Sequence, residues 1–388
     1  MNQSLDTLAD GSDLRVKIIQ SLRAQGFRVR NGTLLPPKEL SKQRIRELHK
    51  TAVEHRIERA RDGLFRKENE LLQHIASGHE IVPSRICPRL IEVFPESEEE
   101  LLFRYASLHW SIPVSSGYGR RLRFLVVDEN NGKLIGLIGL GDPVFSLRPR
   151  DEWVGWTPAD RKDRLRNVMD AFVLGAVPPY SFLLCGKLVA MLATSDTIRV
   201  AFKRKYGGAC SVIRRKVHDG RLALITTTSA LGRSSVYNRL RFGERLLYRS
   251  VGFTKGSGEF HFSNGLYGAI AEFAEENCEP TAKQERWGTG FRNRREVIRK
   301  CLPALGLSSD WLYHGIEREV FLIPFAWNTR EFLRGQHSRL MWYHQSEAEI
   351  FEYFRDRWML PRASWDERFK SRSKDEWAIW LKKENGRG

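Results

Sequence analysis

Residues 122–140 commit this chain to a β-sheet. Two apolar runs rich in strand-forming side chains, 124–127 and 134–140, lie on either side of Asn131-Gly132. Asn-Gly between two such runs is a strong signal for a tight hairpin, because both turn residues readily adopt positive φ. We therefore expect two antiparallel strands joined at Asn131-Gly132.

Further apolar segments predict how the sheet continues. The segments 169–177 and 222–227 have the composition of buried strands, and Pro178-Pro179 ends the first. Between them, residues 181–205 repeat apolar side chains at helical spacing. The hairpin and both strands should form one mixed β-sheet, with the 181–205 helix crossing one of its faces.

With 388 residues the chain has room for two or three domains. We expect an α+β fold in three parts. Residues 1–95 should form an N-terminal basic helical region and residues 96–277 an α/β core. Residues 278–388, rich in Arg and Trp, should form an α/β extension that completes the core or packs on it.

The charge balance points to a polyanionic partner. Lys and Arg number 64 against 47 Asp and Glu, which gives a formal net charge of +17. Nucleic acid is the first partner to test for such a chain. A helical stretch from Ser41 to about residue 78 is basic along one face, which is either a solvated face of a packed helix or a surface for phosphates. The candidates for contact with a nucleic-acid backbone are Arg44, Arg56 and Arg59.

Several classes of protein are disfavoured. No uncharged apolar run is long enough to cross a bilayer, and the first residues are polar and acidic, unlike a signal peptide. The five cysteines lie far apart without a Cys-x-x-Cys pair, and their odd number fits the reduced thiols of a cytoplasm. His109 and His261 are isolated, so we expect no metal site. These features predict a cytoplasmic protein without membrane contact.

The densest polar stretch, residues 226–239, follows a strand end. Segments in that position often carry function, so its hydroxyls and arginines could hold phosphates or position a substrate. Ser234 could equally cap a following helix, and Tyr237 could be structural. The candidate ligand contacts in this stretch are Thr228, Ser229, Gly232, Arg233, Ser234, Asn238 and Arg239.

Two further candidate sites have weaker support from the sequence. The helix that follows Pro178-Pro179 would present free N–H groups to an anion, although no Gly-rich phosphate loop precedes it and an ordinary buried strand and helix is the alternative. Its candidate contacts are Tyr180, Ser181 and Lys187. A basic cleft is the other candidate, although an Arg–Asp pair is usually structural. Its residues would be Arg120, Arg121, Arg123, Arg150 and Asp151.

A long series of segments carries a family resemblance. It includes WSIPVSSGYGRRLRFLVVDENNGKLIGLIGLGDPVF, RDEWVGW, MDAFVLGAVPPYSFLLCGKLVAML, TTTSALGRSSVYNRLRF, VGFTKGSGEFHF and REVFLIPFAWNTREFLRG. From about residue 40 to the C-terminus, the chain resembles the A components of Druantia, a multi-gene bacterial anti-phage defence system. The resemblance implies a role in antiviral defence, with other Druantia proteins as partners.

The central segments also resemble a GNAT-type acyltransferase core. RFLVVDENNGKLIGLIGL is similar to its hairpin, AFVLGAVPPY to its splayed fourth strand and SFLLCGKLVAML to the helix that holds the coenzyme A pyrophosphate. LALITTTSALGRSSVYNRLRF is similar to the fifth strand and a helix with a tyrosine acid, which implies Tyr237 as a catalytic residue. Only Gly186 matches a glycine of the coenzyme A motif, so a coenzyme A-type ligand stays an open question.

Three functions are compatible with these features. The GNAT-like core could be a module that recognises invading nucleic acid, which the charge of +17 favours. It could be an acyl- or aminoacyl-transferase that modifies nucleic acid or protein. The chain could also be an assembly subunit whose aromatic C-terminal part is an interface, since aromatic side chains concentrate at interface cores. We favour the first.

Overall fold

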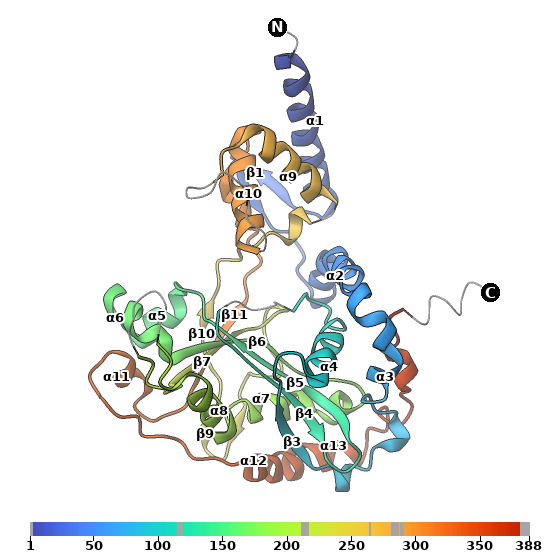
Figure 1. Ribbon diagram of the computed structural model, residues 1–388, viewed down its shortest axis with the longest axis vertical. Helices are drawn as coiled ribbons and strands as arrows, with labels where there is room; N and C mark the ends of the chain where they lie inside the picture. The colour runs from blue at the N-terminus through green and yellow to red at the C-terminus, as the bar shows by residue number, and fades with distance from the viewer. Residues whose placement is uncertain are drawn as a thin grey trace, which may run out of the picture.

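The computed structural model describes residues 3–114, 119–210, 217–263, 265–280, 287 and 291–380. Its centre is a seven-stranded mixed sheet (Figure 1). In spatial order the strands are β10 (Arg249–Phe253), β11 (Glu319–Pro324), β7 (Leu224–Thr228), β6 (Val168–Ala176), β5 (Lys133–Gly141), β4 (Arg121–Asp128) and β3 (Pro88–Glu92). Neighbouring strands in this sheet are antiparallel except β6 and β7, which are parallel.

The expected hairpin and the expected single sheet are both confirmed. β4 and β5 pair antiparallel, and Gly132 in the turn has a φ of 71°, which favours glycine. The helix expected over 181–205 is divided into α7 (Cys185–Leu192) and α8 (Asp196–Tyr206). Together they form the crossover connection that a parallel pair of strands requires.

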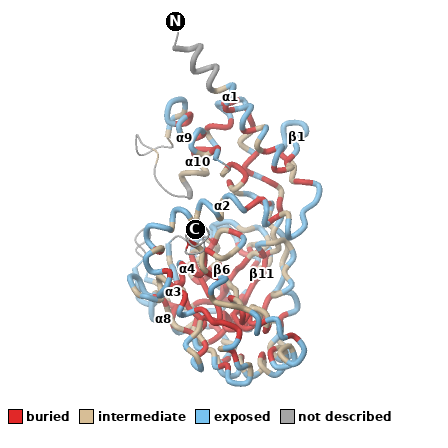
Figure 2. Tube along the Cα trace, turned by 90° about the vertical axis from the view of Figure 1, so that its right-hand side faces the viewer, coloured by how far each residue is buried: buried red, intermediate tan, exposed pale blue. Residues whose placement is uncertain are grey.

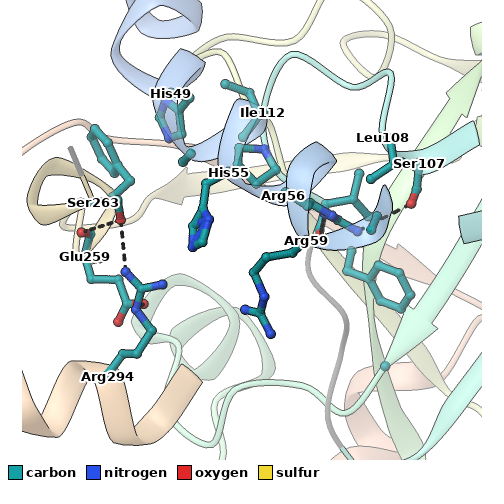
Figure 3. A pocket seen from close by; sticks show the side chains of 18 of the residues that line it. His49, His55, Arg56, Arg59, Ser107, Leu108, Ile112, Glu259, Ser263 and Arg294 are labelled. Carbon is teal, nitrogen blue, oxygen red and sulfur yellow. Dashed lines mark hydrogen bonds and ion pairs between the residues drawn. The ribbon is translucent and has the colours of Figure 1, made fainter. Parts of the chain in front are cut away.

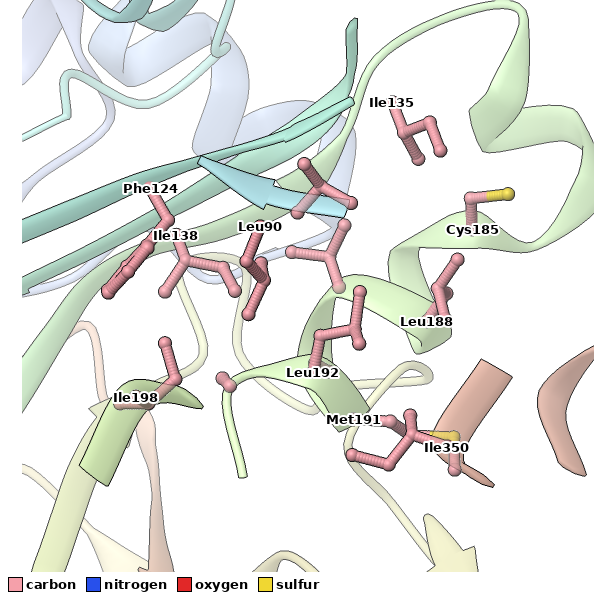
Figure 4. Close-up of a cluster of buried hydrophobic side chains, with 14 of the residues drawn as sticks. Leu90, Phe124, Ile135, Ile138, Cys185, Leu188, Met191, Leu192, Ile198 and Ile350 are labelled. Atoms are coloured by element: carbon pink, nitrogen blue, oxygen red, sulfur yellow. The ribbon is translucent and has the colours of Figure 1, made fainter. Parts of the chain in front are cut away.

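One face of the sheet is buried beneath α7, α8 and α12 (Glu347–Phe354) (Figure 4). Phe124 and Ile138 project from the strands toward Leu188 and Leu192 of α7. Gly136 of β5 permits a close approach, because a Cβ there would lie 2.7 Å from the Val189 side chain. Apolar residues alternate along β4, so Leu125 faces the opposite side of the sheet from Phe124.

The opposite face is covered by α4 (Glu98–Ser107), α3 (Glu68–Leu72) and the last described residues, near Trp377 and Trp380. The buried carboxylate of Glu68 holds this layer together. It accepts hydrogen bonds from the Tyr105 hydroxyl at 2.9 Å and from the Ile379 backbone N–H at 2.6 Å. Glu68 therefore fixes the C-terminal segment to a helix more than 300 positions earlier in the chain.

A second lobe stands above the sheet (Figure 1). Its own buried cluster joins α1 (Gln3–Ala24), β2 (Thr33–Leu35), α9 (Leu266–Asn277) and α10 (Phe291–Ala304), and the exposed strand β1 (Arg28–Arg30) pairs with β2. Figure 2 shows buried stretches both within this lobe and around the sheet. The division of the chain at residues 95 and 277 stays a prediction, and the buried clusters cut across it.

α2 (Lys42–Leu64) lies where the second lobe meets the sheet (Figure 1). Ser41 is its N-cap, and its side chain accepts a hydrogen bond from the Arg44 N–H, as its position before the basic helix indicated. The remaining elements are α5 (Arg148–Val154), α6 (Pro158–Arg164), β8 (Arg241–Phe242), β9 (Arg245–Leu246), α11 (Thr329–Leu333) and α13 (Leu360–Ala363). Across the described residues, no helix combines the length and apolarity needed to cross a membrane.

Glu68→Gln should lower the free energy of unfolding by roughly 1.5–3 kcal/mol, because the neutral amide keeps one acceptor oxygen but loses the second and the charge that strengthens these hydrogen bonds. It should also expose residues 374–380 to limited proteolysis. Chemical denaturation and protease digestion measure the two effects. Glu70→Gln, on the same helix, is the control, since Glu70 forms only an exposed ion pair with Lys67. Equal stability of the two variants would contradict the role given to Glu68.

Candidate functional site

A cavity of about 800 Å³ lies between α2, α4, the sheet and the second lobe (Figure 3). Arg56 and Arg59 of α2 and Arg104 of α4 line it, as does Asp170 of β6. Residues just before β11, among them Arg318, line it as well. These residues are widely separated in sequence and meet only in the folded chain.

The arginines of this cavity differ in how they are bonded. Arg56 donates to the Val114 carbonyl and, at 3.4 Å, to the Ser107 hydroxyl. Arg59 points into the open space in Figure 3 and, within the part of the chain that the structure describes, has no hydrogen-bond or ion-pair partner. Among the same residues, no carboxylate pairs with Arg56, Arg59, Arg104 or Arg318. We call these four residues the arginine set.

Three carboxylates also line the cavity, and two of them are neutralised by other arginines. Asp142 forms an ion pair with Arg120 at 2.6 Å, and Glu259 pairs with Arg294 at 3.3 Å. The third, Asp170, accepts a hydrogen bond from the Thr226 hydroxyl at 2.5 Å. Burial raises the pKa of Asp170 to about 6, although the Thr226 hydrogen bond and the charge of Arg150 oppose this shift.

The positive charge of the cavity at neutral pH comes from arginine rather than from buried histidine. Burial lowers the pKa of His49 to about 4 and that of His314 to about 3, so both rings are neutral at pH 7. The His49 ring stacks on Phe260 with centroids 4.1 Å apart and thereby links α2 to the second lobe. Within the described residues, no group of His, Cys, Asp and Glu has the arrangement of a metal site.

The candidates at residues 180–187 lie away from this cavity. Tyr180 is fully buried, and its hydroxyl donates to Asp128 at 2.9 Å. The Ser181 N–H donates to the Val177 carbonyl, and the Lys187 ammonium lies over the Trp358 ring at 5.7 Å. A Cβ at Gly186 would meet only open space. Their role as ligand contacts stays a prediction.

The expected helix after residue 230 is wrong. Residues 230–239 form successive turns, and the Ser234 hydroxyl accepts hydrogen bonds from the Val236 and Tyr237 N–H groups within one of them. A φ of 80° at Gly232 and of 58° at Arg239 is incompatible with a continuous α-helix. Ser234 therefore caps a turn rather than a helix. A serine makes similar hydrogen bonds to the backbone in both settings, so the sequence alone predicted the wrong element.

The other candidates of this stretch separate into buried and exposed groups. Ser229 is buried and donates its N–H to the Glu319 carbonyl, while Thr228 is half-buried in β7. The exposed candidates are Arg233, Asn238 and Arg239. Tyr237 is half-buried against the core: its ring stacks on Tyr248 with centroids 4.9 Å apart and planes 7° apart. Burial raises the pKa of Tyr237 to about 12, so its hydroxyl is protonated at pH 7.

The five residues expected to form a basic cleft are not brought together in the cavity. Arg150 is fully buried and donates to the Val144 and Phe145 carbonyls, with Asp151 as its ion-pair partner. Arg123 pairs with Glu100 at 2.7 Å, and Arg121 is exposed. Arg120 neutralises Asp142 from outside the cavity lining. Their cleft stays a prediction.

Sequence reasoning missed Arg104, Arg318 and Asp170 as members of one site. Asp170 appeared as a single carboxylate without a partner, and Arg104 and Arg318 lie in no dense polar stretch. Strand register supplies the missing information, because Asp170 of β6 lies opposite Gly141 of β5, next to Asp142. Without knowledge of the strand pairing, the amino-acid sequence contains no signal that these three residues belong to one site.

The fold and the cavity define a class: a mixed α/β protein in which unpaired arginines from separate elements line one pocket. Comparison with known proteins identifies the family. The family model for Druantia protein DruA matches residues 39–335, and the chain belongs to that family. It is 41% identical over 352 residues to Druantia protein DruA of Escherichia coli (strain UMEA 4076-1), covering 90% of this chain and 87% of that protein. No solved structure matches the chain.

Family membership supports involvement in the Druantia anti-phage defence system, as the sequence resemblance implied. The match begins at residue 39, so α2 and the whole cavity lining fall within the matched range. The residues that line the site are thus part of the DruA-family portion of the chain.

The pH dependence of stability should report on Asp170. Because burial raises its folded-state pKa from 3.8 to about 6, Asp170 stabilises the fold fully below pH 4 and loses that contribution as pH rises through 6. The stability of wild type relative to Asp170→Asn should therefore fall between pH 4 and pH 7. Urea unfolding at four pH values measures the difference.

Asp62→Asn, at an exposed position of α2, is the control and should follow the wild type across this pH range. A wild-type advantage over Asp170→Asn that stays constant from pH 4 to pH 7 would contradict the environment described for Asp170.

Proposed function

We propose that this DruA-family protein serves Druantia defence as a recognition component that binds nucleic acid at the arginine-lined cavity. The observation that carries the proposal is the arginine set: Arg56, Arg59, Arg104 and Arg318 converge on one cavity without a carboxylate partner among the described residues. Like charges in a confined space repel one another, so such a group favours an anion between its members.

Phosphate is the anion that fits this arrangement best. A guanidinium presents planar, paired donors that match phosphate oxygens, and partial burial strengthens each charged hydrogen bond. The chain as a whole carries a net charge of +17, which would attract a polyanion toward the cavity over longer distances. Other Druantia proteins remain the partners that family membership suggests, and we place this activity in the cytoplasm, away from membranes.

The strand order supports a GNAT-like core as the scaffold of this module. An antiparallel series β3, β4, β5 and β6 leads to the parallel neighbour β7, and β11 is inserted between β7 and β10. The helix that follows β6 crosses one face of the sheet, as the helix after the fourth strand does in the GNAT arrangement. The proposal uses this core for binding and needs no catalytic step.

The residues present fit a coenzyme A-type ligand poorly. A turn at Tyr180–Leu183 separates β6 from α7, and Leu184 with a φ of 62° begins the helix where the GNAT pattern has a glycine-rich turn. Arg362 donates to the Phe182 carbonyl at 3.2 Å and so occupies this turn from the C-terminal part of the chain. We derive no step through coenzyme A.

Substitutions on α2 alone can test whether the positive charge of the cavity contributes to DNA binding. Arg59→Ala should reduce the slope of log K against log salt for duplex DNA by about 0.9 unit, the value of one lost phosphate contact. Fluorescence anisotropy between 50 and 200 mM salt gives the slope. Arg44→Ala is the matched control: the sequence named Arg44 as a backbone contact, but it lies outside the cavity lining, pairs with Glu47 at 3.0 Å and donates to the Gln25 carbonyl. Equal salt slopes for Arg59→Ala and Arg44→Ala would show that the cavity is not part of the DNA-binding surface.

One observation favours a second candidate function, an acyl- or aminoacyl-transferase acting on nucleic acid or protein. β6 and β7 pair only as far as Ala171 and Thr227, and the Tyr237 hydroxyl lies 3.5 Å from the Leu174 carbonyl beyond that point. A protonated tyrosine between diverging strands would be placed to donate a proton to a leaving group.

Tyr237→Phe separates a catalytic from a structural tyrosine. Loss of a general acid should reduce phage protection and any transferase rate, the latter by about 10²–10⁴-fold, without loss of folded protein. A structural tyrosine should cost only about 1 kcal/mol, with protection intact. Plaque assays and thermal unfolding distinguish the two, and the binding proposal expects the second result.

A further inference from the structure

A second cavity lies on a different part of the molecule. It has a volume of about 670 Å³, adjoins β8 and β9, and shares no lining residue with the arginine-lined cavity. Its walls come from β8, β9 and the segment 342–345, together with Trp327, which follows β11. We call it the aromatic groove.

Aromatic rings and arginines both line this groove. The Trp327 side chain is 73% exposed, an unusual position for the largest apolar residue. Its ring lies 4.8 Å from that of Tyr343 at an angle of 53°, so the two rings meet at a tilt rather than face to face. The Arg245 guanidinium stacks over Tyr343 at 4.0 Å and is held by the Gln345 side chain.

The lining of the groove also carries more positive than negative side chains. Arg241, Arg245 and Arg249 line it against one carboxylate, that of Glu244. Arg249 is exposed at the start of β10, and among the described residues its guanidinium has no partner. An exposed ring beside arginines that no described carboxylate neutralises offers a face for stacking and a counter-charge at the same place.

We infer that the aromatic groove binds a single-stranded segment of nucleic acid, with an unpaired base stacked on Trp327 and the neighbouring phosphates at Arg245 and Arg249. Stacking on an exposed aromatic ring requires a base that is free of its duplex partner, and every base has such a face. The three arginines favour a polyanion over an uncharged aromatic peptide. The inference deepens the proposed function in its ligand class but rests on different residues.

The test uses fluorescence anisotropy of the full chain with a labelled oligo(dT) and with a blunt duplex. Trp327→Ala should weaken oligo(dT) binding by about 5- to 140-fold, the range for loss of one stacked base. Duplex binding should change less than about 2-fold, since a base pair within a helix offers no free face at this ring. Trp327→Phe should recover most of the lost affinity for oligo(dT).

Trp365→Ala is the matched control. Trp365 is 68% exposed and lies beneath an arginine, Arg362 at 4.1 Å, but it does not line the groove. The variant should bind both probes as the wild type does. Equal effects of Trp327→Ala and Trp365→Ala, or an equal loss of duplex and oligo(dT) binding in Trp327→Ala, would overturn the inference.

The arginine-lined cavity is tested separately in the same assay. If Arg59→Ala leaves the duplex salt slope unchanged while Trp327→Ala loses oligo(dT), the proposed function fails and the groove stands. If Arg59→Ala behaves as expected and Trp327→Ala does not, the groove fails alone. A wild-type chain that binds neither probe overturns both.

Discussion

The parallel pairing of β6 with β7 determines the positions of the elements around it. Parallel neighbours cannot be joined by a tight turn, so the chain must leave the sheet after β6 and run back to the end of the sheet at which β6 began before it enters β7, and α7 and α8 form this connection. The pairing is short and is reinforced by the Thr227 hydroxyl, which donates to the Ala171 carbonyl at 3.0 Å. Beyond this point β6 continues along β5 to Ala176, whereas β7 passes into the turns at 230–239.

The same pairing explains the electrostatics of the arginine-lined cavity. Side chains alternate along a strand, so Met169 and Ala171 of β6 enter the core beneath α7 while Asp170 faces the other side. Parallel register places Thr226 directly beside Asp170, within hydrogen-bond distance. A half-buried carboxylate that, among the described residues, accepts a hydrogen bond from one hydroxyl is more easily protonated, which is the physical origin of the raised pKa of Asp170.

Apart from the membership of the strands in one mixed sheet, what the sequence could predict was local. The Asn131-Gly132 turn, the strands on either side of it and the start of a helix at Ser41 depend on neighbouring residues, and each was confirmed, although that helix ends at Leu64 and α3 follows it. The helix expected after residue 230 failed because turn geometry at Gly232 and Arg239 outweighs the cap-like serine. The arginine-lined cavity could not be predicted, since its residues come from α2, α4, β6 and the approach to β11, and no periodicity records which distant segments pack together.

The net charge of a basic protein says little about which cations are available to a ligand. Arg150 and Arg59 contribute equally to the formal charge of +17, yet Arg150 is enclosed by carbonyls and Asp151 while Arg59 faces open space. Some arginines are internal hydrogen-bond donors and are not available to a ligand. A buried charge is tolerated only when its donors are satisfied. Other arginines line the two cavities, one with few aromatic rings in its lining and one beside an exposed tryptophan. These two surfaces differ in the chemistry they can recognise: the first can sense phosphate charge, and the second can also distinguish an unpaired base from a paired one.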